Sequence, residues 1–335
     1  MKKITVKEIA KMAGVSVTTV SFVLNNKPGV SDAIRKKVQD IIDETNFKPN
    51  LNSRKLLKNK SYNICLIINS SSSPFEDLFY FDITRGIINQ AHRYGYNLII
   101  SKLESDNEDL PELVYSGETD GIIFFQDISK VILKKAKECG IPFVIVDSHS
   151  NIDGITSVNP DYSTATYDAT SYLIDQNHKN IVMIAKKDVA DFYKQTFDGF
   201  KKALSDNGIQ IRKDQKELIA SSEDDAYSIA KKLLTSQNKP SAILCTTDIF
   251  AIGAIRAAKD CKLSIPKDVS IMGIDDIFLS RYIEPRLTTV GVNKEDMGVY
   301  ATDLLYKKMK GKVPQNILLP MNLVIRDSVR KLKKD

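Results

Sequence analysis

The first 45 residues carry apolar side chains at the three- and four-residue spacing of short amphipathic helices. The tetrapeptide Thr5-Val6-Lys7-Glu8 has the form of a capping box, so we expect a helix to begin there. Its apolar stripe would consist of Val6, Ile9, Ala10 and Ala13. Gly14 follows this stripe, and glycine readily adopts the left-handed backbone that ends a helix.

A second helix is expected directly after this glycine, with Ser16 as its cap and residues 17–24 as its body. It would bury Val20, Val23 and Leu24 and would project outward Val17, Thr18, Ser21 and Phe22. A third helix is expected from the cap Ser31 to about Thr45, with an inward stripe of Ile34, Val38, Ile41 and Ile42. Two helices joined by a tight glycine turn have the helix-turn-helix form. The pattern alone is also compatible with a purely structural three-helix bundle.

After residue 62, short apolar runs rich in β-branched residues alternate with helical patterns. The strand-like runs are 63–69, 96–101, 120–125, 142–147, 180–185, 241–247 and 268–275. The helical patterns include residues 80–95, 129–139, 161–177, 192–207 and 248–261. This alternation predicts the α/β class, with parallel sheets covered by helices on both faces. The number of units over some 265 residues favours two doubly wound lobes over one.

In such sheets, ligands bind beyond the carboxyl ends of the strands. The side chains expected at these ends are Asn69, Ser70, Phe75, Phe125, Gln126, Asp147, Thr247, Asp248 and Asp275. Several acceptors and an aromatic ring that converge on one cleft could bind a polyhydroxylated molecule such as a sugar or a nucleoside. Asp248 also stands at the cap position of the next helix, so capping is an alternative explanation for it.

The basic charge is concentrated at one end of the chain. Residues 1–60 hold 13 Lys and Arg against 5 Asp and Glu, whereas the remaining 275 residues hold 35 against 37. A small basic headpiece on a nearly neutral domain is typical of a protein that binds DNA phosphates and releases their counterions. A solvated basic surface remains the alternative for the charge taken alone.

The sequence has no apolar segment of the length of a secretory signal at its start, and no run that approaches 18 apolar residues. We therefore expect a cytoplasmic protein that does not contact a membrane. The four cysteines form no CxxC pair and are expected to be buried, reduced thiols: Cys65, Cys139, Cys245 and Cys261.

Motifs of common enzyme classes are missing from the sequence. It has no phosphate-binding loop, no GxSxG and no HExxH, and His92, His149 and His178 belong to no metal-binding spacing. We therefore expect no catalytic residues, no metal and no cofactor. The alternative is an enzyme that uses Asp147, Asp248 and Asp275 as acid–base carboxylates, and an absence of turnover alongside ligand-controlled DNA binding would exclude it.

The segment AKMAGVSVTTVSFVLNNKPGVSDAIRKKV resembles the headpiece of the LacI family of bacterial transcription regulators, and KPNLNSRKLLKNKS resembles that family's hinge. The resemblance implies a homodimer on a pseudo-palindromic operator, with a hinge helix that orders when two protomers meet on DNA. It implies DNA contacts by Thr5, Ser16, Val17, Thr18, Thr19, Ser21, Phe22, Asn25, Asn50, Ser53, Arg54 and Leu56. By position, Leu56 would be the apolar wedge inserted into the minor groove.

One departure lies in the expected recognition helix. Many family members read TVSRVLN where this chain reads TVSFVLN, so Phe22 replaces an arginine that could contact guanine. Phenylalanine cannot donate hydrogen bonds. We expect an operator that differs from the common half-site at the base pair such an arginine would read, with more of the reading done by Val17, Thr18 and the hinge.

The resemblance continues through SVNPDYSTATYDATSYLIDQNHKNIVMI and PSAILCTTDIFAIGAIRAAKDCKLSIPKDVSIMGIDD, and it implies a two-lobed sensor of the periplasmic-binding-protein type. Four positions at which sugar- or purine-binding members carry polar or aromatic anchors differ here: Phe125, Thr196, Ser221 and Thr247. We therefore expect the effector to differ from a standard hexose. A binding protein of the periplasmic type is the alternative, but it would need an export signal and no headpiece.

The expected boundaries are 1–48 for the headpiece, 49–60 for the hinge and 61–335 for the effector-binding and dimerisation domain. One lobe would comprise residues 61–160 and 293–318, and the other residues 161–292 and 319–330. The last strand is followed by no heptad tail, so a dimer is expected rather than a tetramer held by a coiled coil.

Overall fold

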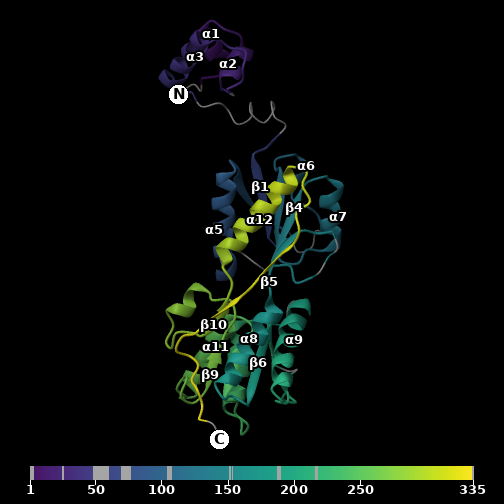
Figure 1. Cartoon of the computed structure of the whole chain (residues 1–335), viewed down its shortest axis with the longest axis vertical. Coiled ribbons are helices and arrows are strands. Elements are labelled where there is room, and N and C mark those ends of the chain that lie inside the picture. Colours follow the sequence, from purple (N-terminus) through teal and green to yellow (C-terminus); the bar gives the residue numbers. More distant parts are fainter. Residues whose placement is uncertain are drawn as a thin grey trace. The chain divides into compact units, whose positions relative to one another are not determined.

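The computed structural model describes residues 4–24, 26–47, 60–68, 77–103, 108–150, 152, 154–186, 190–215 and 218–333. The chain divides into two compact units, Met1–Tyr62 and Asn63–Asp335. The first is a small helical unit and the second a larger α/β unit (Figure 1). Among the described residues, no helix combines the length and the apolar character needed to cross a bilayer.

The helical unit contains α1 (Val6–Ala13), α2 (Val17–Leu24) and α3 (Asp32–Glu44). The predicted capping box is confirmed, because the Thr5 hydroxyl accepts from the Glu8 amide at 3.3 Å and the Glu8 carboxylate accepts from the Thr5 amide at 2.7 Å. Gly14 ends α1 at φ +67°. The Ser16 hydroxyl accepts from the Thr19 amide at 3.0 Å and so caps α2. Ser31 precedes α3 as expected, but its side chain makes no capping hydrogen bond.

The core of this unit consists of Ile9, Ala10, Ala13, Val20, Val23, Val38, Ile42 and Phe47. Leu24 and Ile41 pack against it from partly buried positions. The expectation that Ile34 joins this core is wrong, because its side chain is 37% exposed. It lies in the first turn of α3, a turn before the buried Val38.

The amino-terminal half of the α/β unit, here the N-lobe, is built on a six-stranded parallel sheet in the order β11-β5-β4-β3-β1-β2. The strands are β1 (Asn63–Ile68), β2 (Asn97–Lys102), β3 (Gly121–Phe125), β4 (Phe143–Val146), β5 (Ser157–Pro160) and β11 (Ile317–Leu319). The helices are α5 (Leu78–Arg93), α6 (Glu112–Tyr115), α7 (Lys130–Glu138) and α12 (Lys294–Met309).

Alternation along the strands explains why both faces of this sheet are covered. In β1, Ile64, Leu66 and Ile68 belong to the core that includes α5 and α12 residues. Cys65 and Ile67 point the other way, into a core shared with α6 and α7. A strand buried on both faces reads as a continuous apolar run, which is why the sequence pattern identified it.

The second lobe, here the C-lobe, repeats this plan with a four-stranded parallel sheet in the order β7-β6-β8-β9. Its strands are β6 (Ile181–Lys186), β7 (Ile219–Ala220), β8 (Ala242–Cys245) and β9 (Ser270–Met272). Its helices are α8 (Tyr162–Asp175), α9 (Ala190–Asp206), α10 (Glu223–Leu234), α11 (Asp248–Asp260) and the short η2 (Phe278–Arg281). An antiparallel pair, β10 (Thr289–Gly291) and β12 (Asn322–Val324), completes the lobe.

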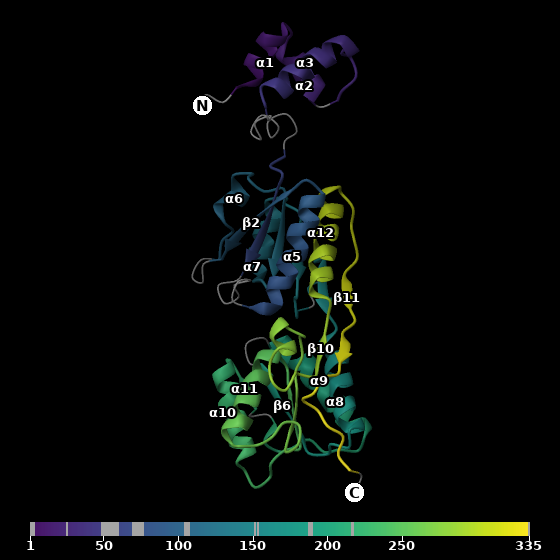
Figure 2. The same ribbon diagram turned by 90° about the vertical axis from the view of Figure 1, so that its left-hand side faces the viewer.

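Three pairs of helices pack closely, and each pair has a glycine at its point of closest approach. A Cβ at Gly86 of α5 would overlap the Glu295 carbonyl of α12, and one at Gly199 of α9 would overlap the Ser163 carbonyl of α8. A Cβ at Gly253 of α11 would likewise lie 2.6 Å from the Glu223 carbonyl of α10. Each pair is therefore packed backbone to backbone (Figure 2).

The chain passes between the lobes three times, after β5, between β10 and α12, and between β11 and β12. Two of these crossings are tied together, because the Asp161 amide donates to the Leu319 carbonyl at 2.9 Å. Both lobes share one continuous apolar core along these crossings.

The expectation of four buried thiols is only half right. Cys65 and Cys245 are buried in strands, and burial raises the pKa of the Cys65 thiol to about 12. Cys139 is exposed and Cys261 is half-buried. Both of these follow the last turn of a helix, where the chain leaves the core.

Candidate functional site

The cleft between the lobes is a cavity of about 330 Å³. Strand ends of both sheets line it, together with the first turns of α5, α8, α9, α10 and α11. The polar and charged side chains that line it are Asp77, Gln126, Asp147, His149, Lys186, Ser221, Ser222, Glu223, Thr247 and Asp275. This position, beyond the carboxyl ends of parallel strands, is where doubly wound sheets bind ligands.

Asp147 is buried at the end of β4, with φ of +61°. Its Oδ2 accepts from the Tyr80 hydroxyl and its Oδ1 from the Tyr162 hydroxyl at 2.9 Å. Burial is the main cause of the raised pKa of both tyrosines, so both hydroxyls stay protonated as donors. Since Tyr80 lies in the first turn of α5 and Tyr162 begins α8, the Asp147 carboxylate joins the two lobes.

Asp275 follows β9 with φ of +122°, which is an unusual backbone conformation for a residue other than glycine. Among the described residues, no group donates a hydrogen bond to its carboxyl oxygens. Burial, followed by the nearby charge of Asp248, holds the pKa of Asp275 well above its usual range. Its backbone carbonyl accepts from the Lys294 ammonium at 2.5 Å, and Lys294 begins α12 of the N-lobe. The carboxyl group of Asp275 is therefore an unused acceptor that faces the cleft.

Acidic side chains outnumber basic ones in the described lining of the cleft. Among the described lining residues, four carboxyl groups, those of Asp77, Asp147, Glu223 and Asp275, face one lysine, Lys186. Asp77 caps α5 by accepting from the Phe79 amide at 2.9 Å, and burial raises its pKa. Glu223 pairs with Arg256 at 3.2 Å.

Aromatic rings supply the apolar surface of the cleft. They are those of Phe79, Tyr80, Tyr162, Phe192 and Phe250. Tyr162 and Phe192 meet edge to face, with ring centroids 4.8 Å apart. A ring flanked by acceptors suits a molecule that has hydroxyl groups at its edge and an apolar face.

In the helical unit, α2 presents a mixed surface. Val17 is 45% exposed and Thr18 is also exposed, whereas Ser21 and Phe22 are half-buried. Thr19 is half-buried as well, and its hydroxyl lies 2.9 Å from the Ser16 hydroxyl. Val17 and Thr18 are thus the positions of α2 best placed to reach another molecule.

The ring of Phe22 lies against the turn that follows α2. A Cβ at Gly29 would stand 3.7 Å from this ring, and the Lys27 ammonium lies 5.7 Å from the ring centroid. Arg35 of α3 holds the same turn, because its guanidinium donates to the Lys27 carbonyl at 2.7 Å and to Asn26 Oδ1 at 3.1 Å. Part of the Phe22 ring therefore serves the packing of the headpiece itself.

Comparison with known proteins matches both units of the chain. Residues 5–50 match the family model described as bacterial regulatory proteins of the lacI family, and residues 170–329 match a periplasmic binding protein-like domain. The HTH-type transcriptional repressor PurR of Pasteurella multocida (strain Pm70) is 32% identical over 97% of this chain and 98% of its own length.

The chain belongs to the LacI family.

Catabolite control protein A of Priestia megaterium is also 32% identical, over 98% of this chain and 99% of its own. A solved structure of the lac repressor dimer, bound to operator and the anti-inducer ONPF, covers 98% of this chain and 100% of its own. It has a TM-score of 0.83 and 25% identity. As a LacI-family member, the chain is a DNA-binding transcription regulator with an effector-binding domain of the periplasmic-binding-protein type.

One strand-end residue of this LacI-family chain has a different role from either of those expected. The cap of α11 is Thr247, whose hydroxyl accepts from the Phe250 amide at 3.3 Å, so the prediction that Asp248 caps this helix is wrong. Asp248 is fully buried and does not line the cleft. Its carboxylate accepts from the Ile277 amide at 3.0 Å and from the hydroxyls of Ser280 and Thr289 at 2.6 Å. It therefore holds together the segments after β9.

Two other predicted effector contacts lie behind the cleft surface. Phe125 is fully buried and packs against the Tyr80 ring at 5.0 Å between centroids. Thr196 is also fully buried, and its hydroxyl donates to the Phe192 carbonyl of its own helix at 2.9 Å. The structure brings together Gln126, Asp147, Ser221, Thr247 and Asp275 at the cleft.

Several predicted contacts fall outside the described residues. In the headpiece and hinge these are Asn25, Asn50, Ser53, Arg54 and Leu56. In the cleft they are Asn69, Ser70 and Phe75. Thr5 lies within the described part of the headpiece and serves the capping box of α1.

Sequence reasoning missed the cleft residues that come from helix starts. Asp77, Tyr80, Tyr162 and Phe192 line the cleft from the first turns of α5, α8 and α9. A signal was available, because Asp77 and Asp161 occupy capping positions and so mark where these helices begin. His149 also lines the cleft, although no role was predicted for it from the sequence.

Proposed function

We propose that the chain represses transcription as a homodimer on a pseudo-palindromic operator, and that an uncharged polyhydroxylated molecule in the cleft controls its affinity for that operator. The observation that carries the effector part is the Asp275 carboxyl group, which accepts no hydrogen bond from the described residues, in a cleft whose described lining has four carboxyl groups and one lysine. The lac repressor dimer, which is bound to both operator and an anti-inducer, supports the assembly.

The charge of the cleft argues for the effector class. A phosphorylated metabolite would bring negative charge among carboxyl groups that outnumber the basic side chains of the described lining, at the energetic cost of burying an anion next to them. Hydroxyl groups would instead donate to Asp275, while the aromatic rings cover an apolar face. Gln126, Ser221 and Thr247 would supply further hydrogen bonds. We assign no catalytic role to these carboxylates.

Asp275 also offers a route from the effector to the pose of the lobes. The Lys294 ammonium is held by the carbonyls of Asp275 and Asp276, at 2.5 and 2.9 Å. A ligand on the Asp275 carboxyl group would thus act next to a contact between the C-lobe and α12. Because a ligand shifts a conformational equilibrium only by its differential affinity, this contact is where binding and lobe pose would be linked.

On DNA, we assign base reading to Val17, Thr18, Ser21, Phe22 and Asn25, and backbone positioning to Thr5, Ser16 and Thr19. In the hinge, residues 49–60, we assign minor-groove contacts to Asn50, Ser53 and Arg54 and the wedge to Leu56. The headpiece would then span residues 1–48 and the sensor residues 61–335. A regulator that acts on genomic DNA belongs in the cytoplasm.

A calorimetric titration of the full chain tests the effector class. The matched probes are ribose against ribose 5-phosphate and uridine against uridine 5′-monophosphate. We expect an uncharged probe to bind, its phosphate to bind at least about tenfold more weakly, and Asp275→Ala to weaken the uncharged probe by a similar factor. Tighter binding of the phosphorylated partner in both pairs would contradict the assignment.

A further inference from the structure

The α/β unit contains a second cavity, of about 310 Å³, bordered by the segment that follows β4. We call it the hinge pocket, after the crossings between the lobes; it is distinct from the hinge of residues 49–60. It lies between β5, Gln195 of α9 and residues 316–318 of the β11 segment. Its volume is close to that of the cleft and falls at the lower end of the range of small-molecule sites.

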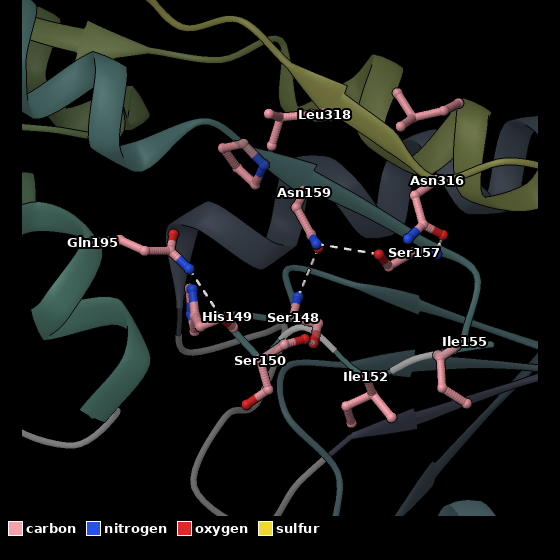
Figure 3. Close-up of a pocket in the computed structure, with 12 residues that line it drawn as sticks. Ser148, His149, Ser150, Ile152, Ile155, Ser157, Asn159, Gln195, Asn316 and Leu318 are labelled. Carbon is pink, nitrogen blue, oxygen red and sulfur yellow. Dashed lines mark hydrogen bonds between the residues drawn. The ribbon is translucent and has the colours of Figure 1, made fainter.

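The hinge pocket is polar, and its described lining residues include no lysine, arginine, aspartate or glutamate. Gln195 and Asn316 stand at its two ends with Asn159 between them (Figure 3). Isoleucines 152 and 155 form one side, and Leu318 stands on the other. This lining differs from the acidic cleft and suits an uncharged molecule with polar ends and an apolar body.

Internal hydrogen bonds hold the polar groups in place without using all of their capacity. Asn159 Oδ1 accepts from the Ser148 amide at 2.8 Å, and its Nδ2 donates to the Ser157 hydroxyl at 3.2 Å. Asn316 Oδ1 accepts from the Ser157 amide at 3.1 Å, and Gln195 Nε2 donates to the His149 carbonyl at 2.9 Å. Among the described residues, Asn316 Nδ2 and Gln195 Oε1 make no hydrogen bond, so a donor and an acceptor remain at opposite ends.

An apolar side chain is also left uncovered at the mouth of the pocket. Leu318 is 64% exposed although it belongs to β11, the edge strand of the N-lobe sheet. A ligand in the pocket would cover this side chain and so gain the free energy of removing apolar surface from water.

The position of the pocket links it to the movement of the lobes. Gln195 belongs to the C-lobe, whereas β5 and β11 belong to the N-lobe and lead into two of the crossings. His149 lines both cavities, with its ring 4.9 Å from that of Phe192 and its Nε2 3.8 Å from Asp147 Oδ2. A ligand here contacts both lobes and a residue of the cleft, so its affinity depends on their relative pose.

We propose that the hinge pocket is a second ligand site, for an uncharged hydroxyl- or amide-bearing metabolite about the size of a monosaccharide. Such a ligand would act as a second regulatory input beside the cleft effector. The inference rests on the lining of this pocket and on the chain being an effector-controlled regulator, and its test separates the two sites.

The experiment is a calorimetric titration of the full chain with ribose, xylitol, uridine and nicotinamide, in three variants and wild type. Asp275→Ala disables the cleft, and Asn316→Trp fills the hinge pocket. Gln315→Trp is the matched control, because Gln315 is exposed next to Asn316 but does not line the pocket. Unchanged melting temperatures of the variants verify that they fold.

We expect at least one probe to bind Asp275→Ala and Gln315→Trp with unchanged affinity and to lose at least about tenfold in Asn316→Trp. If every probe binds wild type, Asn316→Trp and Gln315→Trp alike, the second site is overturned while the cleft assignment stands. The second site is also overturned if Asn316→Trp weakens the binding of none of the four probes. If Asp275→Ala leaves the binding of every probe unchanged, the cleft assignment alone is overturned.

Discussion

Asp248 shows how a buried carboxyl group makes stability depend on pH. Burial raises its pKa from 3.8 to about 6, although three hydrogen bonds oppose this shift. The folded state therefore binds this proton more tightly than the unfolded chain does. Its contribution to the free energy of unfolding consequently falls by about 3 kcal/mol as pH rises from about 4 to about 6.

The substitution Asp248→Asn removes this titration while it keeps the shape of the side chain. We expect the unfolding free energy of wild type relative to Asp248→Asn to fall by about 3 kcal/mol between about pH 4 and about pH 7. Denaturant melts of both proteins across this range would measure it. A difference that stays constant with pH would show that Asp248 has an ordinary pKa.

Phe22 combines two roles that a pair of alanine variants can separate. Its ring is half-buried against Gly29, so we expect Phe22→Ala to destabilise the headpiece by about 1–2 kcal/mol. Val17→Ala, at an exposed position of the same helix, should leave stability unchanged and alter the selected operator sequence. Hydrogen exchange of α1–α3 and selection of bound DNA would measure the two effects. A strict guanine requirement that Phe22→Ala abolishes would contradict our account of this residue.

For single residues, the sequence predicted the acceptors that follow strands, because the strand ends of a parallel sheet share one edge. Asp147 and Asp275 were found in this way. The sequence did not predict that Asp147 accepts hydrogen bonds from two tyrosines whereas the Asp275 carboxyl group accepts none from the described residues. The reason is that the tyrosines that donate to Asp147 come from helices of both lobes. The role of Asp248 was missed because its partners lie some 30 to 40 residues further along the chain.

Among the elements, the helix pairs depend on single glycines. A Cβ at Gly199 of α9 would overlap the Ser163 carbonyl of α8 and approach the Tyr167 amide at 3.0 Å. Backbone atoms of a packed helix cannot move aside as a flexible side chain can, so Gly199→Ala should cost about 1–3 kcal/mol despite its better helix propensity. Lys201→Ala, at an exposed position of the same helix, is the control. Equal melting temperatures for the two variants would contradict this packing.

The sequence predicted the elements that have strong local patterns. Of the missed elements, some form only through distant partners, and others have a clear pattern that was not recognised. The helix α12 carries Met297, Ala301, Leu304 and Leu305 at helical spacing, so it was detectable. The strand β5 spans only four residues and includes Pro160. It is a strand because β4 and β11 pair with its two sides, and the β11 partner lies 159 residues further on.

For the molecule as a whole, the basic headpiece and the acidic cleft divide two tasks between two units. The division was visible in the sequence, since the excess of lysine and arginine ends near residue 60. The composition of the cleft was not, because its residues come from strand and helix ends spread between Asp77 and Ile277. Only the folded lobes bring the four carboxylates to one surface.

Operator affinity, measured by fluorescence anisotropy with the cleft ligand present and absent, tests the central claim most directly. We expect an uncharged probe that binds the cleft to change the operator Kd of wild type by at least about fivefold. Asp275→Ala should bind the operator as wild type does without the probe, and its Kd should not respond to the probe. An operator Kd that stays the same in wild type when the cleft is saturated would contradict the account.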